Sequence, residues 1–301
     1  MTRRRSLREW RDQILRRIVL PLLFPRNLGS YLLDEKWDNL IILDACRYDV
    51  FREVVQASGL HGVLTSRISR GTDTASFLRE NFASSAPLDD TVYVTSNPWV
   101  SKLLAGKFFE IVPVWKGGWD EEKRTVLPET VFESAKEAIK RYPGKRFIIH
   151  FFQPHAPFLG YHGFAGLPRR RVPRPLLVYT RRDSYHWPSV TRETLIWLHK
   201  RNLLLVLPYL RELLKVLPGT TVVTADHGDA MGELLHPLIP IRVYQHPPGA
   251  RIPALVTVPW FAVRSSQSRE LPSKETLGRP EEITAEEESI IQDRLSALGY
   301  I

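Results

Sequence analysis

Cysteine is nearly absent from this sequence, since Cys46 is the only one in 301 residues. A disulfide within the chain and a cysteine-rich zinc site are therefore both excluded. Long hydrophobic runs are missing too, because no apolar stretch approaches the roughly 20 residues that a membrane-spanning helix needs. The run from Ile18 to Phe24 is short, is broken by Pro21, and precedes no small-residue cleavage site, so a secretory signal is not expected. These absences lead us to expect a cytoplasmic protein.

The composition is that of a folded globular domain. Hydrophobic residues make up 43% of the chain and charged residues 25%, which excludes disordered and fibrous classes. A chain of 301 residues is long enough for one large α/β domain with a sizeable core. We assign residues 31–301 to this domain and residues 1–30 to a separate basic amphipathic segment.

The positive charge is concentrated in two places. Residues 1–17 contain seven arginines against two acidic residues, and residues 169–182 contain six arginines and no acidic residue, in a formal net charge of +9. Such blocks are typical of proteins with an anionic partner, and no specific nucleic acid is expected. Leu7, Trp10, Ile14 and Ile18 follow helical spacing with arginines between them. This pattern suits either peripheral contact with the inner face of a membrane through residues 1–24 or a basic helix packed on its own domain.

Short apolar runs rich in branched residues predict buried strands, and amphipathic stretches between them predict helices. Alternation of strands and helices predicts a mostly parallel central sheet covered on both faces, an α/β/α sandwich. Pro208 should kink or split the last long helix. The expected strands are Asn39–Leu43, Phe147–Phe152, Thr220–Thr224 and Ile252–Val258; the expected helices are Arg47–Ala57, Ala75–Asn81, Pro128–Arg141, Val190–Val216 and Ala285–Leu298; the expected loops are Ala156–Ser189 and Ser265–Pro280.

Acidic residues and a histidine follow two of these strands directly. Asp44 ends the run Leu-Ile-Ile-Leu-Asp at residues 40–44, and Asp226 and His227 follow Thr-Val-Val-Thr-Ala at residues 221–225. The carboxyl ends of parallel strands are where open α/β sheets form binding crevices. Mixed carboxylate and imidazole ligation suits zinc, manganese or a similar divalent ion. The alternative for each segment alone is an aspartate that caps the following helix.

Hydroxyl groups and further histidines lie near other strand ends. Thr72 and Thr74 follow Gly71 and open a predicted helix, where free amide groups favour an anionic group. A metal there would activate a threonine for attack on phosphorus or sulfur. His150 and His155 lie near the end of the second strand, and His246 precedes the last one. Taken singly, each of these residues is equally typical of a helix cap or a loop.

The order of these segments resembles the alkaline phosphatase superfamily, and most of all its sulfatase-like branch. The segments are Leu-Asp-x-x-Arg-x-Asp at residues 43–49, a hydroxyl nucleophile some 30 residues later, a His-rich strand end, Asp-His-Gly-Asp at residues 226–229, and His246 before Val-Pro-Trp. The ending Leu-Ser-Ala-Leu-Gly-Tyr at residues 295–300 is similar to the closing helix of many such chains. The resemblance runs from about Asp38 to the end of the chain.

The resemblance implies a role for each candidate residue. It makes Asp44, Asp226 and His227 ligands of a divalent metal, which would be zinc, manganese, calcium or magnesium. Thr74 is the preferred nucleophile and a fourth metal contact, while Thr72 stays open as the alternative nucleophile. Arg47 and His155 join Thr74 as catalytic candidates, and His150, His246 and Thr72 are substrate-binding candidates.

One departure from the sulfatase pattern narrows the chemistry. The chain has no Cys-x-Pro-x-Arg or Ser-x-Pro-x-Arg, so conversion to formylglycine is not expected. We therefore predict a metal-dependent hydrolase of phosphate or sulfate esters that uses a threonine nucleophile. Two alternatives remain: a phospho-group transferase acting on a glycan or lipid headgroup, and a non-catalytic relative that binds an anion. In each case the partner is an anionic ester or polymer.

Overall fold

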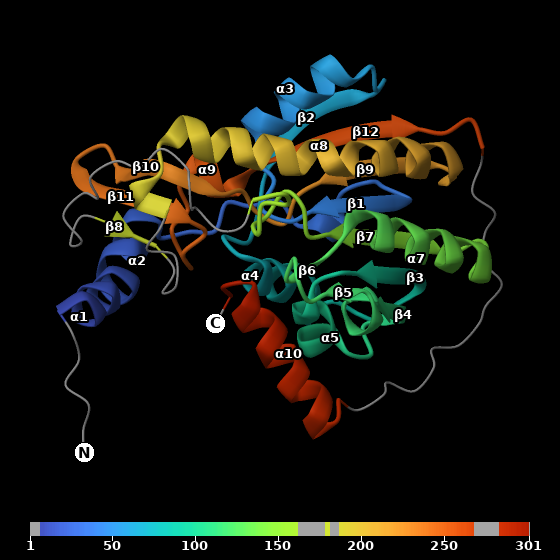
Figure 1. The fold of residues 1–301 in the computed structure, drawn as a ribbon, viewed down its shortest axis with the longest axis horizontal. Coiled ribbons are helices and arrows are strands. Elements are labelled where there is room, and N and C mark those ends of the chain that lie inside the picture. Colours follow the sequence, from blue (N-terminus) through green and yellow to red (C-terminus); the bar gives the residue numbers. More distant parts are fainter. Residues whose placement is uncertain (1–6, 162–177, 181–186, 268–282, 301) are drawn as a thin grey trace.

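A seven-stranded sheet forms the centre of the protein in the computed structural model, which describes residues 7–161, 178–180, 187–267 and 283–300 (Figure 1). Its strand order is β2-β12-β9-β1-β7-β3-β4. The five strands from β9 to β4 pair in parallel, and only β12 runs antiparallel to its neighbours. The strands are β1 (Asn39–Leu43), β2 (Val63–Ile68), β3 (Leu88–Thr95), β4 (Phe108–Pro113), β7 (Arg146–Phe151), β9 (Thr220–Thr224) and β12 (Thr257–Arg264).

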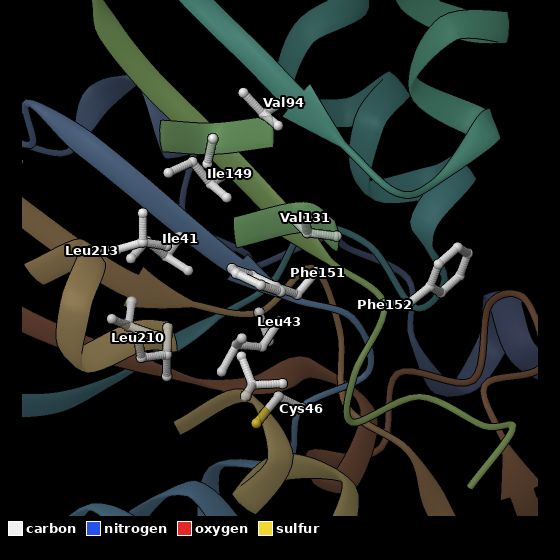
Figure 2. Packing of buried hydrophobic residues seen from close by; sticks show 14 of the residues in the cluster. Ile41, Leu43, Cys46, Val94, Val131, Ile149, Phe151, Phe152, Leu210 and Leu213 are labelled. Carbon is white, nitrogen blue, oxygen red and sulfur yellow. The ribbon is translucent and has the colours of Figure 1, made fainter. Parts of the chain in front are cut away.

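Helices cover both faces of this sheet. Successive side chains of a strand point to opposite faces, so Ile41 and Leu43 pack against α3 (Tyr48–Ser58), α7 (Pro128–Arg141) and α8 (Arg192–Val216). Figure 2 shows part of this packing, including Ile149 of β7 with Leu210 and Leu213 of α8. Leu40 and Ile42 pack on the other face against α4 (Thr74–Leu78), η3 (Arg79–Ala83) and α5 (Pro98–Leu104). The predicted α/β/α sandwich is therefore confirmed.

Smaller elements surround the sandwich. A three-stranded sheet is formed by β10 (Ala230–His236), β11 (Ile239–Gln245) and β8 (Val178–Tyr179), and a continuous helical segment, α1 (Leu7–Ile14), η1 (Leu15–Val19) and α2 (Leu20–Leu23), packs on it. The last helix, α10 (Ala285–Ala297), packs on α5. The remaining elements are η2 (Leu32–Asp34), α6 (Val114–Gly117), the strand pair β5 (Trp119–Asp120) and β6 (Thr125–Val126), η5 (Trp187–Ser189) and α9 (Pro253–Val256). None of the helices in the described ranges is long and apolar enough to cross a membrane.

Most predicted elements are observed, one predicted strand is wrong, and the split predicted at Pro208 is not observed. The expected strand Ile252–Val258 is the short helix α9 followed by β12, because Pro253 occupies the first helical position that its fixed φ favours. Pro208 does not split α8, which continues through it as one helix. Leu203, Val206 and Leu210 are buried on both sides of that position, so packing offsets the roughly 3 kcal/mol that a proline costs inside a helix.

Two predicted loops lie largely outside the described residues. Within 156–189 the structure describes residues 156–161, 178–180 and 187–189, which include β8 and η5. Within 265–280 it describes only residues 265–267. The division at residue 30 stays a prediction, although Leu15 and Leu20 of the amino-terminal segment are buried against the β10–β11–β8 sheet.

Candidate metal centre

Four neighbouring parallel strands end at one place and supply the polar side chains of the site. Asp44 follows β1, His150 lies near the end of β7, Asp226 follows β9, and Asn97 follows β3. Because β9, β1, β7 and β3 are adjacent and parallel, their carboxyl ends share one edge of the sheet. All four side chains are buried. This is the position where open α/β sheets bind their ligands.

Two backbone amides hold the Asp226 carboxylate in place. Asp226 Oδ1 accepts hydrogen bonds from the amides of Ala45 (3.0 Å) and His227 (2.9 Å). Ala45 has a φ of 60°, which is rare outside glycine and turns its amide toward Asp226. Asp226 Oδ2 then faces the Thr74 hydroxyl at 2.8 Å. A side chain on Gly228 would collide with the carbonyl oxygen of Ala254 at 2.2 Å, so the Asp-His-Gly turn requires glycine there.

The Asp44 carboxylate is bound on one oxygen and open on the other. Asp44 Oδ2 accepts hydrogen bonds from the hydroxyl of Tyr300 (2.6 Å) and the side-chain amide of Asn97 (2.9 Å). Asp44 Oδ1 is buried and has no hydrogen-bond partner among the described residues. Burial, reinforced by the charge of Asp226, raises the pKa of Asp44 well above its usual range. A buried carboxylate of this kind is expected only where a cation or a proton compensates it.

Two histidines aim a ring nitrogen at these carboxylates. His227 Nδ1 lies 2.7 Å from the Gly228 carbonyl and donates to it, and Nε2 faces Asp44 Oδ1 (3.7 Å) and Asp226 Oδ2 (3.4 Å). His150 Nδ1 lies 3.1 Å from the Tyr93 hydroxyl, and its Nε2 faces Asp44 Oδ2 at 3.9 Å. Burial lowers the pKa of His150 to about 4, so the ring is neutral near pH 7.

These side chains fit a divalent metal ion. One ligand atom from each of Asp44, His150 and Asp226 lies within 4.8 Å of the others. Asp44 Oδ1 and His150 Nε2 are buried without hydrogen-bond partners in the described part of the chain, as expected of atoms whose partner is an ion. Two carboxylates with imidazole nitrogens form a donor set that suits zinc or manganese. His150, assigned to substrate binding from the sequence, therefore lies in the group best placed to hold the metal.

The structure brings Thr74 to this cluster and turns Thr72 away from it. The Thr74 hydroxyl lies 2.8 Å from Asp226 Oδ2 and 3.4 Å from both Asp44 Oδ2 and His227 Nε2. Thr74 is the first residue of α4, whose N-cap Asp73 forms a capping box with Ser76. The Thr72 hydroxyl instead accepts a hydrogen bond from the Gly249 amide at 2.9 Å.

Arg47 lies outside the cluster. Its guanidinium donates to Asp49 (2.6 Å), to Glu233 (2.8 Å) and to the carbonyl of Asp229 (2.7 Å). Burial alone would lower the pKa of Arg47, but the two carboxylates raise it, so the group stays charged. The substrate-orienting role of Arg47 stays a prediction. Its observed contacts tie it to Asp49 and, through Glu233 and the Asp229 carbonyl, to the β10 region.

His155 and His246 lie beside the cluster. The ring of His155 stacks on Tyr300 with centroids 5.2 Å apart and an angle of 12°, and it lies 4.9 Å from the ring of His246. His246 lies 4.6 Å from the ring of His227 and places Nδ1 3.2 Å from Asp229 Oδ1. Both rings thus border the site, and their catalytic and substrate-binding roles stay predictions.

Asn97 and Tyr300 were not identified from the sequence. Asn97 also caps α5, with its side-chain oxygen accepting from the Trp99 amide at 3.0 Å, so Asn-Pro was typical of a helix start. Tyr300 lies 256 positions from Asp44, and no local pattern links them. The only available signal was the Leu-Gly-Tyr ending itself.

Comparison with solved structures gives several similar folds. The lipooligosaccharide phosphoethanolamine transferase A of Neisseria meningitidis, an integral membrane protein, is 16% identical with a TM-score of 0.50; the match covers 78% of this chain and 49% of that one. The carboxyl-terminal periplasmic domain of phosphoethanolamine transferase EptC from Campylobacter jejuni is 18% identical over 75% of this chain and 78% of that one, with a TM-score of 0.46. An alkaline phosphatase superfamily protein from Vibrio parahaemolyticus is 14% identical over 79% of this chain and 62% of that one, with a TM-score of 0.43.

The comparisons identify the fold of the chain. No protein-family model matches it, and none of the curated proteins does. It spans about half the length of the Neisseria transferase. The chain has the predicted mixed α/β architecture with a mostly parallel seven-stranded sheet, and it shares this fold with the Neisseria transferase. Its place in the sulfatase-like branch stays a prediction.

Proposed function

We propose that this protein is a metal-dependent enzyme that transfers a phosphoester group through Thr74. The observation that carries the proposal is the convergence of the Thr74 hydroxyl with Asp44, Asp226 and His227 at 2.8–3.4 Å. A threonine hydroxyl is a poor nucleophile near pH 7 and needs an adjacent base or a metal to act. A divalent metal held by Asp44, Asp226 and His150 or His227 would supply that activation and would neutralise charge on the transferring group.

The residues support a two-step displacement. In the first step Thr74 Oγ1 attacks phosphorus, the ester bond to the donor alcohol breaks, and the proton of the Thr74 hydroxyl ends on the leaving oxygen. In the second step an acceptor hydroxyl attacks the same phosphorus, releases Thr74 and returns the proton. His155 and His246 border the space in which donor and acceptor would exchange.

Transfer to an alcohol is favoured over hydrolysis, which was the first interpretation of the sequence. The Neisseria protein that shares this fold is a lipooligosaccharide phosphoethanolamine transferase. Hydrolysis is the same chemistry with water as the acceptor, so the residues in the site are common to both. We propose a glycan or lipid headgroup as the acceptor, because the amino-terminal segment presents an apolar surface suited to a membrane.

We expect an acceptor alcohol to divert the product away from water. Purified protein loaded with Zn²⁺ or Mn²⁺ would be given bis-nitrophenyl phosphate, nitrophenyl phosphate or nitrophenyl sulfate, with and without glycerol or a glucosamine lipid. Nitrophenol release from a phosphate ester, together with a phosphorylated acceptor detected by mass spectrometry, is the predicted result. A chelated sample is the control. Product formed only with water would make the protein a hydrolase, and no turnover with any metal or ester would make it a non-catalytic relative.

A row of exposed apolar side chains on the amino-terminal helical segment supports a membrane contact. Trp10, Ile14, Ile18 and Leu22 recur at every fourth position and are 48–75% exposed, whereas Leu15 on the other side is 3% exposed. Arg16 and Arg17 of the same segment are exposed, so a cationic border adjoins the apolar row. We propose that this surface docks on anionic lipid at the inner face of a membrane.

Charge placed in this row should weaken membrane binding. The double variant I14E/I18E is expected to lower partitioning onto vesicles of phosphatidylcholine and phosphatidylglycerol at least tenfold, because burying each isoleucine contributes about 1.5–3 kcal/mol. Turnover of a small soluble ester should not change. Leu238→Glu, at an 86% exposed leucine between β10 and β11, is the matched control and should bind as the wild type does. If I14E/I18E bound vesicles as well as the wild type, the proposed membrane contact would be wrong.

A further inference from the structure

The last described residue of the chain, Tyr300, reaches into the metal centre. Its hydroxyl donates to Asp44 Oδ2 at 2.6 Å, lies 3.1 Å from the Thr74 hydroxyl and accepts from the Asn97 side-chain amide at 3.2 Å. The side chain is buried, with only 4% of the residue exposed. A tyrosine contributed by the closing helix therefore shares a hydrogen-bond network with the proposed nucleophile and a proposed metal ligand.

The end of α10 is built to place this ring. Gly299 has a φ of 78°, its amide bonds to the Ser296 carbonyl, and the Tyr300 amide bonds to the Leu295 carbonyl at 2.8 Å. This pair of bonds is the Schellman motif, which ends a helix and turns the next residue back toward it. Leu295 and Tyr300 belong to the same buried cluster, the apolar contact that usually accompanies the motif. The direction of Tyr300 is thus fixed by local backbone geometry.

The helix itself is anchored on the element that carries Asn97. Ile291, Leu295 and Leu298 are buried, and α10 packs on α5. At the other end of α10, ion pairs join Glu288 to Lys102 of α5 and Glu287 to Lys116 of α6. The Tyr300 ring is held from the other side by its stacking on His155. Tyr300 and Asn97, which both donate to Asp44 Oδ2, are therefore held together by the packing of α10 on α5.

We propose that Tyr300 is a positioning residue of the metal centre, which selects the oxygen of Asp44 that binds the ion. Tyr300 and Asn97 together occupy Asp44 Oδ2, so Oδ1 is the oxygen left without a hydrogen bond among the described residues. A carboxylate fixed in this way presents one oriented oxygen to a cation, and such outer partners of ligands typically contribute 10–100-fold to metal affinity. The closing helix is then a structural part of the centre. The inference rests on the metal centre of the proposed function and does not depend on the acceptor.

Tyr300→Phe removes the hydroxyl and keeps the ring that packs against His155. Calorimetric titration of the metal-free full-length protein with Zn²⁺ or Mn²⁺ alone should give an affinity about 10–100-fold weaker than that of the wild type. Saturating metal should restore turnover to within a few-fold, because the proposal assigns the effect of the hydroxyl to Asp44 and not to the Thr74 hydroxyl, which lies 3.1 Å from it. Tyr179→Phe is the matched control: it removes another buried tyrosine hydroxyl, which donates to the Pro248 carbonyl, accepts from Arg16 and bonds to none of the proposed ligands, so it should leave metal affinity unchanged.

Three results would overturn this role. An affinity of Y300F within twofold of the wild type would show that Tyr300 does not position the ligand. A higher affinity would show that the hydroxyl competes with the ion for Asp44. Turnover that stays low at saturating metal would show that Tyr300 acts on the reacting groups. The titration contains no donor or acceptor, so its result does not depend on whether the enzyme transfers or hydrolyses. If the wild type bound neither ion, the proposed metal centre itself would be wrong.

Discussion

Replacing Asp226 by asparagine is expected to remove bound divalent metal and ester turnover together. The substitution keeps the size of the side chain and removes its charge, at a position where two backbone amides already hold one oxygen. The other oxygen faces Thr74 and His227 and has to balance the charge of the ion. Loss of a direct ligand should exceed the 10–100-fold loss of affinity that an outer partner causes. Turnover should fall by about three orders of magnitude or more, because the metal supplies several kcal/mol of charge stabilisation.

Elemental analysis of D226N and of His227→Ala, beside turnover of a nitrophenyl ester, measures this effect. Asp293→Asn, at an exposed aspartate of α10, is the matched control and should keep both metal and activity. Far-ultraviolet circular dichroism would establish that each variant is folded. If a folded D226N/H227A protein kept one equivalent of tightly bound metal, the ion would lie elsewhere and the site assignment would fail.

The second large effect is expected at Thr74. Thr74→Val replaces the hydroxyl by a methyl group of similar size in a buried position, and far-ultraviolet circular dichroism would establish that the variant is folded. Removal of an attacking side chain typically costs several orders of magnitude, and we expect kcat to fall by about 10³–10⁶. The metal should remain bound, because Asp44, Asp226 and the two histidines are intact. Loss of turnover with metal retained would separate the nucleophile from the ligands.

Thr72→Val is the matched control for this variant. It removes the acceptor of the Gly249 amide and should destabilise the protein by about 1–2 kcal/mol without a comparable loss of kcat. Thermal unfolding and steady-state turnover of both variants decide between the two threonines. Normal turnover in Thr74→Val with severe loss in Thr72→Val would reverse the assignment.

The centre of the sheet could be predicted from the sequence because its strands are continuous apolar runs. Asn39–Leu43 and Thr220–Thr224 are buried on both faces, which makes both strands and the polar residues after them visible locally. Asp44, Asp226 and His227 were found for that reason. By contrast, β2 has the mixed sequence Val-Leu-Thr-Ser-Arg-Ile with four of its six residues exposed, so no apolar run marked it. The Ile252–Val258 run was apolar but is interrupted by a proline that starts a helix.

The parts of the site that depend on long-range packing could not be predicted. The sequence around Asn97 predicts a helix cap, and Asn97 does cap α5. Its additional hydrogen bond to Asp44 forms only because β3 and β1 lie in the same sheet. Tyr300 reaches Asp44 because α10 packs on α5 and ends in a left-handed glycine. The choice between Thr72 and Thr74 depended on one or two residues at the start of α4, which is finer than boundary prediction from sequence allows.

The central claim is that Thr74 carries the transferred group, and trapping the covalent enzyme tests it most directly. Metal-loaded wild-type protein would be mixed with excess bis-nitrophenyl phosphate in the absence of an acceptor, quenched with acid, digested and sequenced by mass spectrometry. The account predicts a nitrophenyl phosphate adduct on Thr74, absent from Thr74→Val and from metal-free protein. An adduct on Thr72 or on any other residue, or turnover of the ester with no covalent species in the quenched protein, would contradict it.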